Sequence, residues 1–408
     1  MNGYIKGISG DIPNTSKEID IDIHGKNLII TGINGSGKTS LLSALHEKVH
    51  FLIAQKKQAD YQQIQSNYDS AQLELSRHKK GTTNYESWTR AAKSYQKDLV
   101  RFTEGLQVEI PDNITFSSGY DDRISIIKYF KADRAAIIDH ATSAVGVLTD
   151  QDNAKNISED RVGSKLEQHL VNLRTRRSLA ITESNDYAIS NRITTWFDEF
   201  DDQLKLLMED DSTGLTFDPD TLKFSILQDG KPDYTFQNLS SGYSAIFDIY
   251  ADLLMRTEYF KVTPKELTGV AFIDEIDAHL HVSLQRIIFP FLTSSFPNIQ
   301  FIVTTHSPFV LMSVDDSVIF DLSSNSQVND DLSLYPYGAI LKGLLGTKPT
   351  SIHLDRIIKE ISELTNSSTP DYGALQILID KIEPIEEKLD SASKAFYMRG
   401  VNTLLDRE

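Results

Sequence analysis

The chain has 408 residues, of which 40% are hydrophobic and 24% charged, the balance of an ordinary globular protein with room for two or three lobes. It contains no cysteine, which excludes disulfides and thiolate metal sites, and no apolar run near the ~18 residues that suggest a membrane span. The net charge of −17 argues against a generally basic surface for nucleic acid, and the N-terminus lacks the build of a signal peptide, so we expect a cytoplasmic protein without a membrane partner.

The N-terminal residues predict a phosphate-binding loop between a strand and a helix. Alternation followed by an apolar run over residues 18–31 predicts a half-buried strand and then a buried one. Residues 32–39 read GINGSGKT and match G-x-x-x-x-G-K-[ST] in full. Lys38 is expected to reach the β- and γ-phosphates and Thr39 to bind Mg²⁺, while backbone N–H groups face phosphate oxygens. The residues expected to bind the nucleotide here are Gly32, Asn34, Gly35, Ser36, Gly37, Lys38, Thr39 and Ser40.

A long helical segment follows the loop. Residues 39–80 contain neither proline nor glycine, and they predict one unbroken arm of roughly 60 Å at ~1.5 Å per residue. After a break at residues 81–84, the helical pattern resumes as a second, shorter arm. We therefore predict a helical hairpin or short coiled coil over residues 43–107.

The middle of the chain alternates between strand and helix patterns. Residues 123–136 predict a strand, residues 155–210 predict helices, and residues 214–231 predict a hairpin of alternating strands. The aromatic residues expected in the core of the helical part are Trp196, Phe197 and Phe200.

A short turn of small polar residues precedes the next helix pattern. Ser240, Ser241 and Gly242 lead directly into an apolar periodicity that extends to Leu254. Such a turn usually serves only as a helix cap, but its N–H groups can also face an anion.

Two carboxylates end the next strand. The apolar run from Val270 to Ile273 predicts a buried parallel strand, and it is followed by Asp274 and Glu275. Asp274 is expected to hold Mg²⁺, directly or through water, and Glu275 to orient or deprotonate the attacking water. Paired with the phosphate loop, these acids predict a hydrolytic site.

The following strand ends in a histidine. Phe301 to Val303 predict a second buried strand that ends in Thr304, Thr305 and His306. His306 at its carboxyl edge is expected to hydrogen-bond the γ-phosphate or the attacking water. Asp277, His279 and His281 could suggest a metal site, but no third clear ligand lies nearby, so they are interpreted as a turn and a helix start.

These elements, in this order, resemble the ABC-type ATPase heads of the SMC and RecF-like class. The resemblance is closest to the OLD-like and the Septu or retron-associated ATPases of prokaryotic phage defence. It rests on GINGSGKTSLL, LSSGYSAIFDIYADLL, FIDEIDAHLHVSLQ and IVTTHSPFVL, which together cover about 65 residues. The fold implied is α/β, a P-loop NTPase of the ABC-ATPase head type with a helical-hairpin insertion and additional helical segments.

The resemblance also implies ATP and Mg²⁺ as ligands, slow ATP hydrolysis with Lys38, Glu275 and His306 as catalytic residues, and a homodimer. In such a pair, Ser240, Ser241 and Gly242 contact the γ-phosphate bound to the other protomer. The chain departs from the family pattern at Ser241, where a second glycine is usual, and at Tyr243, where Gln or Glu is usual. The glutamine loop of the family is not identifiable.

The resemblance divides the chain into segments of one head and its insertions. Residues 1–42, 108–154 and 213–345 are assigned to the ATPase head. Residues 155–212 form a second helical insertion, and residues 346–408 form a C-terminal helical region.

No nuclease constellation follows His306, since Asp315 and Asp316 do not make one. The resemblance therefore implies a separate effector, such as a nuclease or toxin, that this ATPase holds or restrains. A RecF-like or SMC-like repair ATPase that binds DNA directly is the alternative, against which the charge of −17 counts. An ABC transporter subunit ranks last, because roughly 200 residues separate the phosphate loop from the Ser-Gly turn.

Overall fold

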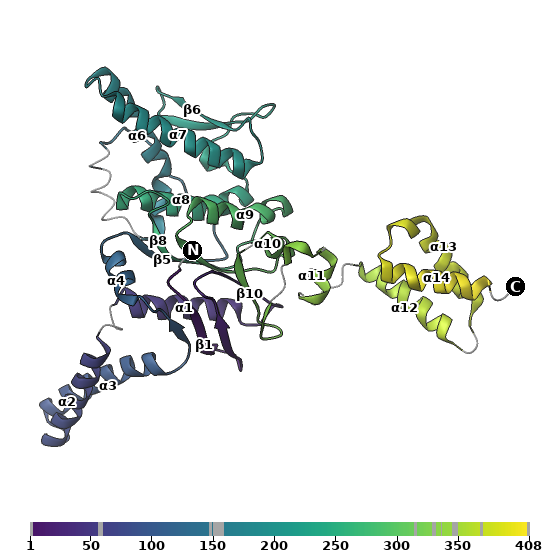
Figure 1. The fold of residues 1–408 in the computed structure, drawn as a ribbon, viewed down its shortest axis with the longest axis horizontal. Helices are drawn as coiled ribbons and strands as arrows, with labels where there is room; N and C mark the ends of the chain where they lie inside the picture. Colours follow the sequence, from purple (N-terminus) through teal and green to yellow (C-terminus); the bar gives the residue numbers. More distant parts are fainter. Residues whose placement is uncertain are drawn as a thin grey trace. The chain divides into compact units, whose positions relative to one another are not determined.

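The computed structural model describes residues 3–55, 60–146, 149, 159–313, 316–328, 332–335, 337–344, 350–367 and 370–405. The chain forms two compact units, residues 1–337 and residues 338–408 (Figure 1). The motifs named above all lie in the first unit.

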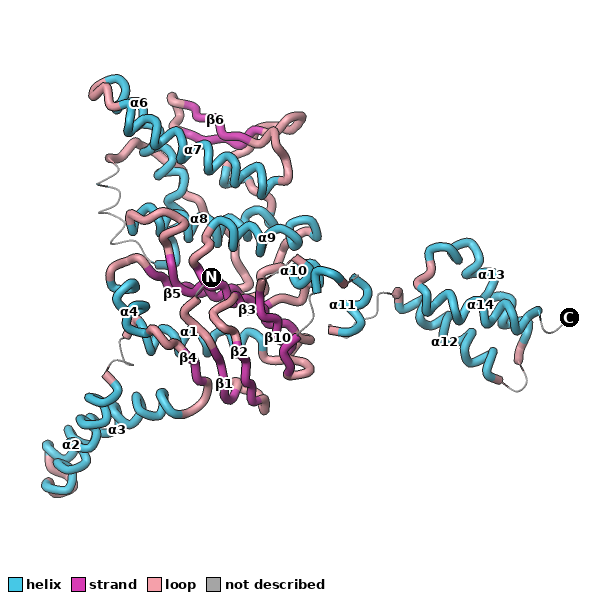
Figure 2. Tube along the Cα trace, viewed as in Figure 1, coloured by secondary structure: helices cyan, strands magenta, loops and turns pink. Residues whose placement is uncertain are grey.

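A six-stranded sheet organises the first unit (Figure 2). Its order is β11 (Ser326–Val328), β10 (Ser317–Asp321), β3 (Asn27–Thr31), β9 (Ile299–Thr304), β8 (Thr268–Ile273) and β5 (Ser125–Phe130). Neighbours from β10 to β5 are parallel, and only β11 is antiparallel. Every residue of β3 and β9 is buried, as expected for parallel strands covered on both faces. The carboxyl ends of β3, β9 and β8 therefore meet at one edge.

Helices cover both faces of this sheet. Figure 1 shows α1 (Lys38–Ile53) and α4 (Asn113–Asp121) on one face, and α8 (Ser241–Phe260) and α9 (Val282–Ser295) on the other. A short helix, α10 (Pro308–Met312), follows β9. The predicted α/β fold class is confirmed: the sheet is parallel over five strands, and a phosphate loop follows β3.

A smaller antiparallel sheet completes the core beside α1. Its order is β2 (Glu18–Asp22), β1 (Gly7–Asp11) and β4 (Gln107–Glu109). In β2 the buried residues alternate with exposed ones, as predicted, and Ile19 and Ile21 join the core that contains Leu41 and Leu45 of α1.

The predicted unbroken arm over residues 39–80 is wrong. α1 ends at Ile53 and α2 (Tyr61–Arg77) begins a new helix, with residues 56–59 outside the described part. The hairpin consists of α2, with 17 residues, and α3 (Thr83–Thr103), with 21, so its first arm is the shorter one and reaches only ~26 Å. Helix propensity alone cannot separate these helices. α1 has eight buried residues because its apolar stripe packs in the head, whereas only Ile64 and Ala71 are buried in α2.

The predicted helices and β-hairpin of the middle segment are present. They are η2 (Glu159–Lys165), α6 (Leu166–Thr182), α7 (Tyr187–Met208), β6 (Gly214–Asp218) and β7 (Lys223–Leu227). Phe197 and Phe200 are buried, and the half-buried Trp196 stacks on Phe200 at 5.4 Å between ring centroids. These aromatic residues form part of the core, as expected.

The second unit is helical and has a core of its own. α11 (Tyr337–Gly343) begins at the boundary, and α12 (Ile352–Asn366), α13 (Tyr372–Ile382) and α14 (Ser391–Leu405) follow. The buried residues of this core are Ile357, Ile361, Leu375, Ile379, Ile382 and Tyr397. Among the described helices of the chain, none has the length and apolar character needed to cross a membrane.

Candidate active site

The phosphate loop connects β3 to α1 by a tight curl. Gly35 and Gly37 have φ angles of 77° and 104°, a region that residues with a side chain rarely adopt. A Cβ atom on Gly35 would meet no atom within 4 Å, so the glycine there is required by the backbone and not by space. The loop ends at Gly37, which is the N-cap of α1.

Lys38 is folded back over this loop. Its side chain is buried, and Nζ donates to the carbonyls of Gly32 (2.9 Å) and Ile33 (3.2 Å). Burial lowers the pKa of Lys38, and the charges of Glu275, Asp274, Asp277 and Asp321 oppose that shift. The ammonium group therefore lies within the phosphate loop and close enough to the acids that follow β8 to be influenced by their charge.

The loop also has an unused buried hydroxyl. Ser36 Oγ is buried and has no hydrogen-bond partner among the described residues. A buried hydroxyl without a partner is costly unless a ligand satisfies it. Together with the curled backbone and Lys38, Ser36 fits a phosphate-bearing ligand, and Thr39, exposed at the start of α1, is available to a cation.

Asp274 and Glu275 leave the end of β8 in different conformations. Asp274 is buried, and its Oδ1 accepts a 2.6 Å hydrogen bond from Thr304 Oγ1. Burial, and Asp274 beside it, raise the pKa of Tyr129 above its ordinary value, so the phenol that donates to Asp274 Oδ2 (3.5 Å) stays protonated. Glu275 is half-buried and has φ 45°, a left-handed conformation that costs roughly 1–3 kcal/mol for a residue with a side chain.

The end of β9 lies between the phosphate loop and these acids. Thr305 N donates to Ile30 O of β3 (3.0 Å), while Thr304 O accepts from Ile276 N (2.9 Å), so β9 is tied to both neighbours. Thr305 Oγ1 donates to Asp277 Oδ1, which also accepts from the backbone N–H of His306 (3.4 Å).

His306 lies close enough to Lys38 to be influenced by its charge. Burial lowers the pKa of His306, Lys38 lowers it further, and Asp277, Glu275 and Asp274 oppose the shift. The imidazole is therefore neutral at pH 7. The structure thus brings together the predicted residues Lys38, Asp274, Glu275 and His306 at one sheet edge.

The Ser-Gly turn forms the start of α8. Ser240 is its N-cap and makes no side-chain capping bond, and both Ser240 and Ser241 are exposed. Gly242 is buried. A Cβ atom there would lie 3.0 Å from Leu284 Cδ1 and 3.3 Å from His279 O, so a larger residue would crowd both. Among the described residues, no hydrogen bond joins this turn to the phosphate loop of the same chain.

Asp277, His279 and His281 form the expected turn and helix start. His281 Nδ1 accepts from Ser283 N (3.5 Å) and caps α9, and His279 has a φ of 64°. Within the described part of the chain there is no group of three His, Asp or Glu side chains that could hold a metal ion.

Sequence reasoning missed Arg134, a buried arginine in the segment after β5. Its Nη1 and Nη2 donate to the carbonyls of Asp274 (2.8 Å), Glu275 (3.0 Å) and Ile276 (2.9 Å). Nothing in the local pattern KADRAA distinguishes this side chain from a surface arginine, because its partners lie about 140 residues away.

Parts of the chain are similar to known proteins. Residues 111–313 match a family described as "AAA domain, putative AbiEii toxin, Type IV TA system", a range that contains β8 and β9 but not the phosphate loop. The "Retron Ec83 probable ATPase" of Escherichia coli is 39% identical over 116 residues, which are 28% of this chain and 20% of that protein.

Two further relatives and one solved structure are similar over other shares of the chain. The "Retron Vc95 probable ATPase" of Vibrio cholerae is 27% identical over 239 residues, 56% of this chain and 43% of that protein. The "Septu protein PtuA" of Bacillus mycoides is 37% identical over 95 residues, 22% of this chain and 13% of that protein. A solved SMC head bound to the C-winged helix domain of ScpA aligns at 15% identity and a TM-score of 0.36, over 78% of this chain and 93% of that chain.

The chain spans less than half the length of each of these curated relatives. The family match contains β8 and β9, whose carboxyl ends meet that of β3 at one edge of the sheet. The chain is therefore similar to the retron ATPases and to Septu PtuA over part of its length, and it has a phosphate loop at the edge of a parallel sheet covered by helices.

Proposed function

We propose that the chain binds and hydrolyses ATP at the edge formed by β3, β9 and β8. The observation that carries this proposal is the position of β9 between the other two strands, which gathers Lys38, Asp274, Glu275 and His306 around one place. Lys38 and the loop N–H groups hold the phosphates, with Ser36 Oγ as a further donor.

Thr39 and Asp274 are the residues that would hold Mg²⁺. A bound Mg²⁺ supplies charge neutralisation on the phosphate oxygens. Thr304 Oγ1 donates to Asp274 Oδ1, which fixes the carboxylate. Oδ2, which accepts a longer bond from Tyr129, would be the oxygen offered to the cation.

Glu275 and His306 act on the attacking water. The Glu275 carboxylate orients the water and accepts its proton, and the neutral His306 ring donates a hydrogen bond to the γ-phosphate or accepts one from the water. The products are ADP and inorganic phosphate.

We further propose that two chains pair around ATP. The free N–H groups at the start of α8, and the exposed hydroxyls of Ser240 and Ser241, complement an anion that the same chain does not supply. The γ-phosphate on the partner's loop is that anion, so ATP joins the protomers and hydrolysis releases them.

The relatives suggest the biological setting. Because this chain is similar to a retron ATPase and to Septu PtuA, we propose that the pair of chains holds or restrains a separate effector, a nuclease or toxin, in anti-phage defence. Co-expression with the neighbouring genes, followed by purification with and without ATP, tests this idea. An effector that never co-purifies in either state contradicts it.

The test of the core proposal is phosphate release by the purified chain together with its mass in solution. We expect Mg²⁺-dependent release of phosphate and a doubling of mass on addition of ATP. Absence of both nucleotide binding and phosphate release would contradict the proposed function.

Direct DNA binding is the alternative function. It predicts an ATP-dependent gel shift that weakens steeply between low and moderate salt. The net charge of −17 favours the outcome without a shift, although Arg174, Arg176 and Arg177 on α6 make a local basic cluster. An ATP-dependent shift at low salt that weakens steeply at moderate salt would favour the repair ATPase over the defence ATPase.

A further inference from the structure

The backbone at Glu275 is held in a conformation that its side chain disfavours. Its φ of 45° bends the chain immediately after β8, and this bend sets the direction of the carboxylate. A left-handed residue at such a position persists only when its surroundings fix it. The contacts around residues 274–276 therefore determine where Glu275 points.

One guanidinium group makes most of those contacts. Arg134 Nη1 donates to Asp274 O (2.8 Å) and to Lys131 O (2.9 Å), and Nη2 donates to Glu275 O (3.0 Å) and Ile276 O (2.9 Å). Three successive carbonyls thus converge on a single side chain, which a regular strand does not allow because its carbonyls alternate in direction. Arg134 therefore defines the bend.

The opposite side of the bend is fixed by β9. Glu275 N donates to Thr304 Oγ1 (2.7 Å), and Ile276 N donates to Thr304 O (2.9 Å). The backbone of Glu275 is therefore fixed on both sides: Thr304 Oγ1 accepts a hydrogen bond from its N–H, and Arg134 Nη2 donates one to its carbonyl. Both contacts use the backbone of Glu275, which leaves its carboxylate for chemistry.

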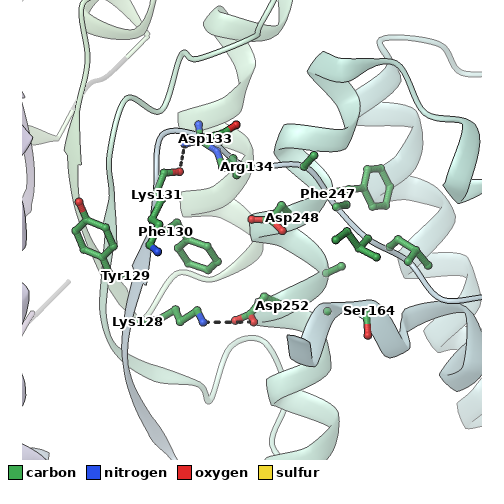
Figure 3. A pocket seen from close by; sticks show the side chains of 16 residues that line it. Lys128, Tyr129, Phe130, Lys131, Asp133, Arg134, Ser164, Phe247, Asp248 and Asp252 are labelled. Carbon is green, nitrogen blue, oxygen red and sulfur yellow. Dashed lines mark hydrogen bonds and ion pairs between the residues drawn. The ribbon is translucent and has the colours of Figure 1, made fainter. Parts of the chain in front are cut away.

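Arg134 also faces the helix that begins at the Ser-Gly turn. The side chain is only 6% exposed and lines a cavity of about 310 Å³ whose other walls include Asp248 and Asp252 of α8 (Figure 3). Arg134 Nε has no hydrogen-bond partner among the described residues, and Asp248 exerts the strongest attraction on the guanidinium charge. The charge of the buried guanidinium is therefore offset by Asp248 on α8, and its N–H groups bond the carbonyls that follow β8.

We infer that Arg134 is the positioning residue for Glu275 in ATP hydrolysis: its planar fork of donors holds the left-handed bend from which the carboxylate reaches the attacking water. This inference rests on the proposed function of Glu275. A lysine cannot replace the arginine, because one ammonium nitrogen with three N–H donors cannot bond the four carbonyls that Nη1 and Nη2 share. Among the described residues Arg134 makes no contact with the phosphate loop. It bonds Asp274 only at the carbonyl, while Thr304 holds the Asp274 carboxylate, so nucleotide binding should depend on Arg134 far less than hydrolysis does.

The test compares Arg134→Lys with the parent and with Arg77→Lys, a control at an exposed arginine that bonds only Glu74 on the hairpin. We expect Arg134→Lys to lower kcat by roughly 100-fold, the loss typical of a displaced catalytic group, with the Kd of a fluorescent ATP analogue unchanged within about threefold. In a Glu275→Gln background the same change should lower the residual rate no further, since the group it positions is already gone.

Hydrogen exchange of the nucleotide-free proteins gives a readout that does not require activity. Arg134→Lys should speed exchange in peptides that contain residues 274–276 and leave those of the phosphate loop unchanged. A parental kcat in Arg134→Lys, a loss of ATP binding equal to the loss of rate, or unchanged exchange at residues 274–276 would overturn the inference. A parent that hydrolyses no ATP would instead overturn the proposed function, while the exchange data would still test the bend.

Discussion

Thr304 is the residue through which two others in the site are oriented. Its hydroxyl donates to Asp274 and accepts from the N–H of Glu275, so a single side chain fixes the acid proposed for the cation and the acid proposed for the water. At this scale, each function depends on one or two atoms, and substitutions can separate binding from hydrolysis.

The first prediction concerns Lys38 and Glu275. Lys38→Ala should weaken ATP binding by roughly 10–100-fold, because a charge-assisted hydrogen bond to phosphate is lost. Glu275→Gln should retain binding but lower kcat by about 100-fold or more, because an amide cannot accept the proton from water. Titration with a fluorescent ATP analogue and a phosphate-release assay measure the two effects. A Glu275→Gln variant with the parental rate would show that another group orients the water.

The second prediction concerns pH and His46 on α1. Burial, followed by the charges of His50 and Lys128, lowers the pKa of His46 from 6.5 to about 4. The unfolded chain therefore binds the proton more readily, so this group's contribution is fully present above pH 6.5 and is lost as pH falls toward 4.

His46 lies between the rings of Tyr129 (5.4 Å) and Phe272 (5.6 Å), so His46→Phe should pack in the same place without titrating. Between pH 7.5 and pH 4.5 the parent should lose roughly 2 kcal/mol more stability than the variant, after allowance for partial exposure. Urea unfolding at both pH values measures this difference. Equal losses in both proteins would assign the acid sensitivity to other groups.

Sequence reasoning could propose the site residues that stand in a recognisable local motif. Lys38, Asp274, Glu275 and His306 each follow a recognisable strand pattern. Arg134 and Thr304 could not be predicted in the same way, because each acts only through partners that folding brings near, about 140 and 30 residues away in sequence.

At the scale of elements, α8 has two roles. It begins at the turn proposed to face a partner, and its Asp248 and Asp252 line the same cavity as Arg134. Its first turn has no acidic residue and no side-chain cap, although Ser240 stands at the N-cap. A helix start of this kind attracts negative charge. The third prediction uses this property to separate folding from pairing.

Ser241→Glu should leave the monomer as stable as the parent or up to about 1 kcal/mol more stable, since a carboxylate near a helix N-terminus is favourable. The same carboxylate should repel the γ-phosphate of a partner and abolish pairing. Sedimentation of the Glu275→Gln protein with ATP, with and without Ser241→Glu, measures the effect, and Ser241→Ala serves as the uncharged control. A dimer that survives Ser241→Glu would mean that this turn does not face the partner's phosphate.

Elements with strong apolar patterns were predictable and short ones were not. β3, β8 and β9 are runs of buried residues, which the sequence makes plain. β1, which contains two glycines, and β4, which has three residues, have no such pattern and form only because they pair with each other and with β2. Patterns also failed at the boundary between α1 and α2, where burial and not propensity makes the difference.

At the scale of the whole molecule, the chain has two units with separate cores, and every proposed site residue lies in the unit of residues 1–337. The fourth prediction follows from this division. A ligand that binds one folded unit stabilises that unit by RT ln(1 + [L]/Kd) and leaves an independent unit unchanged.

Calorimetry of Glu275→Gln should therefore show that Mg²⁺ and ATP at about 100 times the Kd add roughly 2.7 kcal/mol to the first unit's stability. The transition of residues 338–408 should keep its temperature. The Lys38→Ala protein provides the control: with its Kd raised roughly 10–100-fold, the same ATP concentration should add only about 0.4–1.4 kcal/mol to the first unit. A single transition that shifts as one would show that the two units unfold together.

The sheet order also has a consequence for synthesis on the ribosome. β3, which carries the phosphate loop, pairs only with β9 and β10, so its hydrogen-bonding partners begin at Ile299. At about 5–20 residues per second, the nascent loop waits roughly 15–50 s before a neighbouring strand emerges. The nucleotide pocket is consequently among the last parts of the head to assemble, and a chain interrupted before residue 299 would have all of GINGSGKT and no framework to hold it in shape.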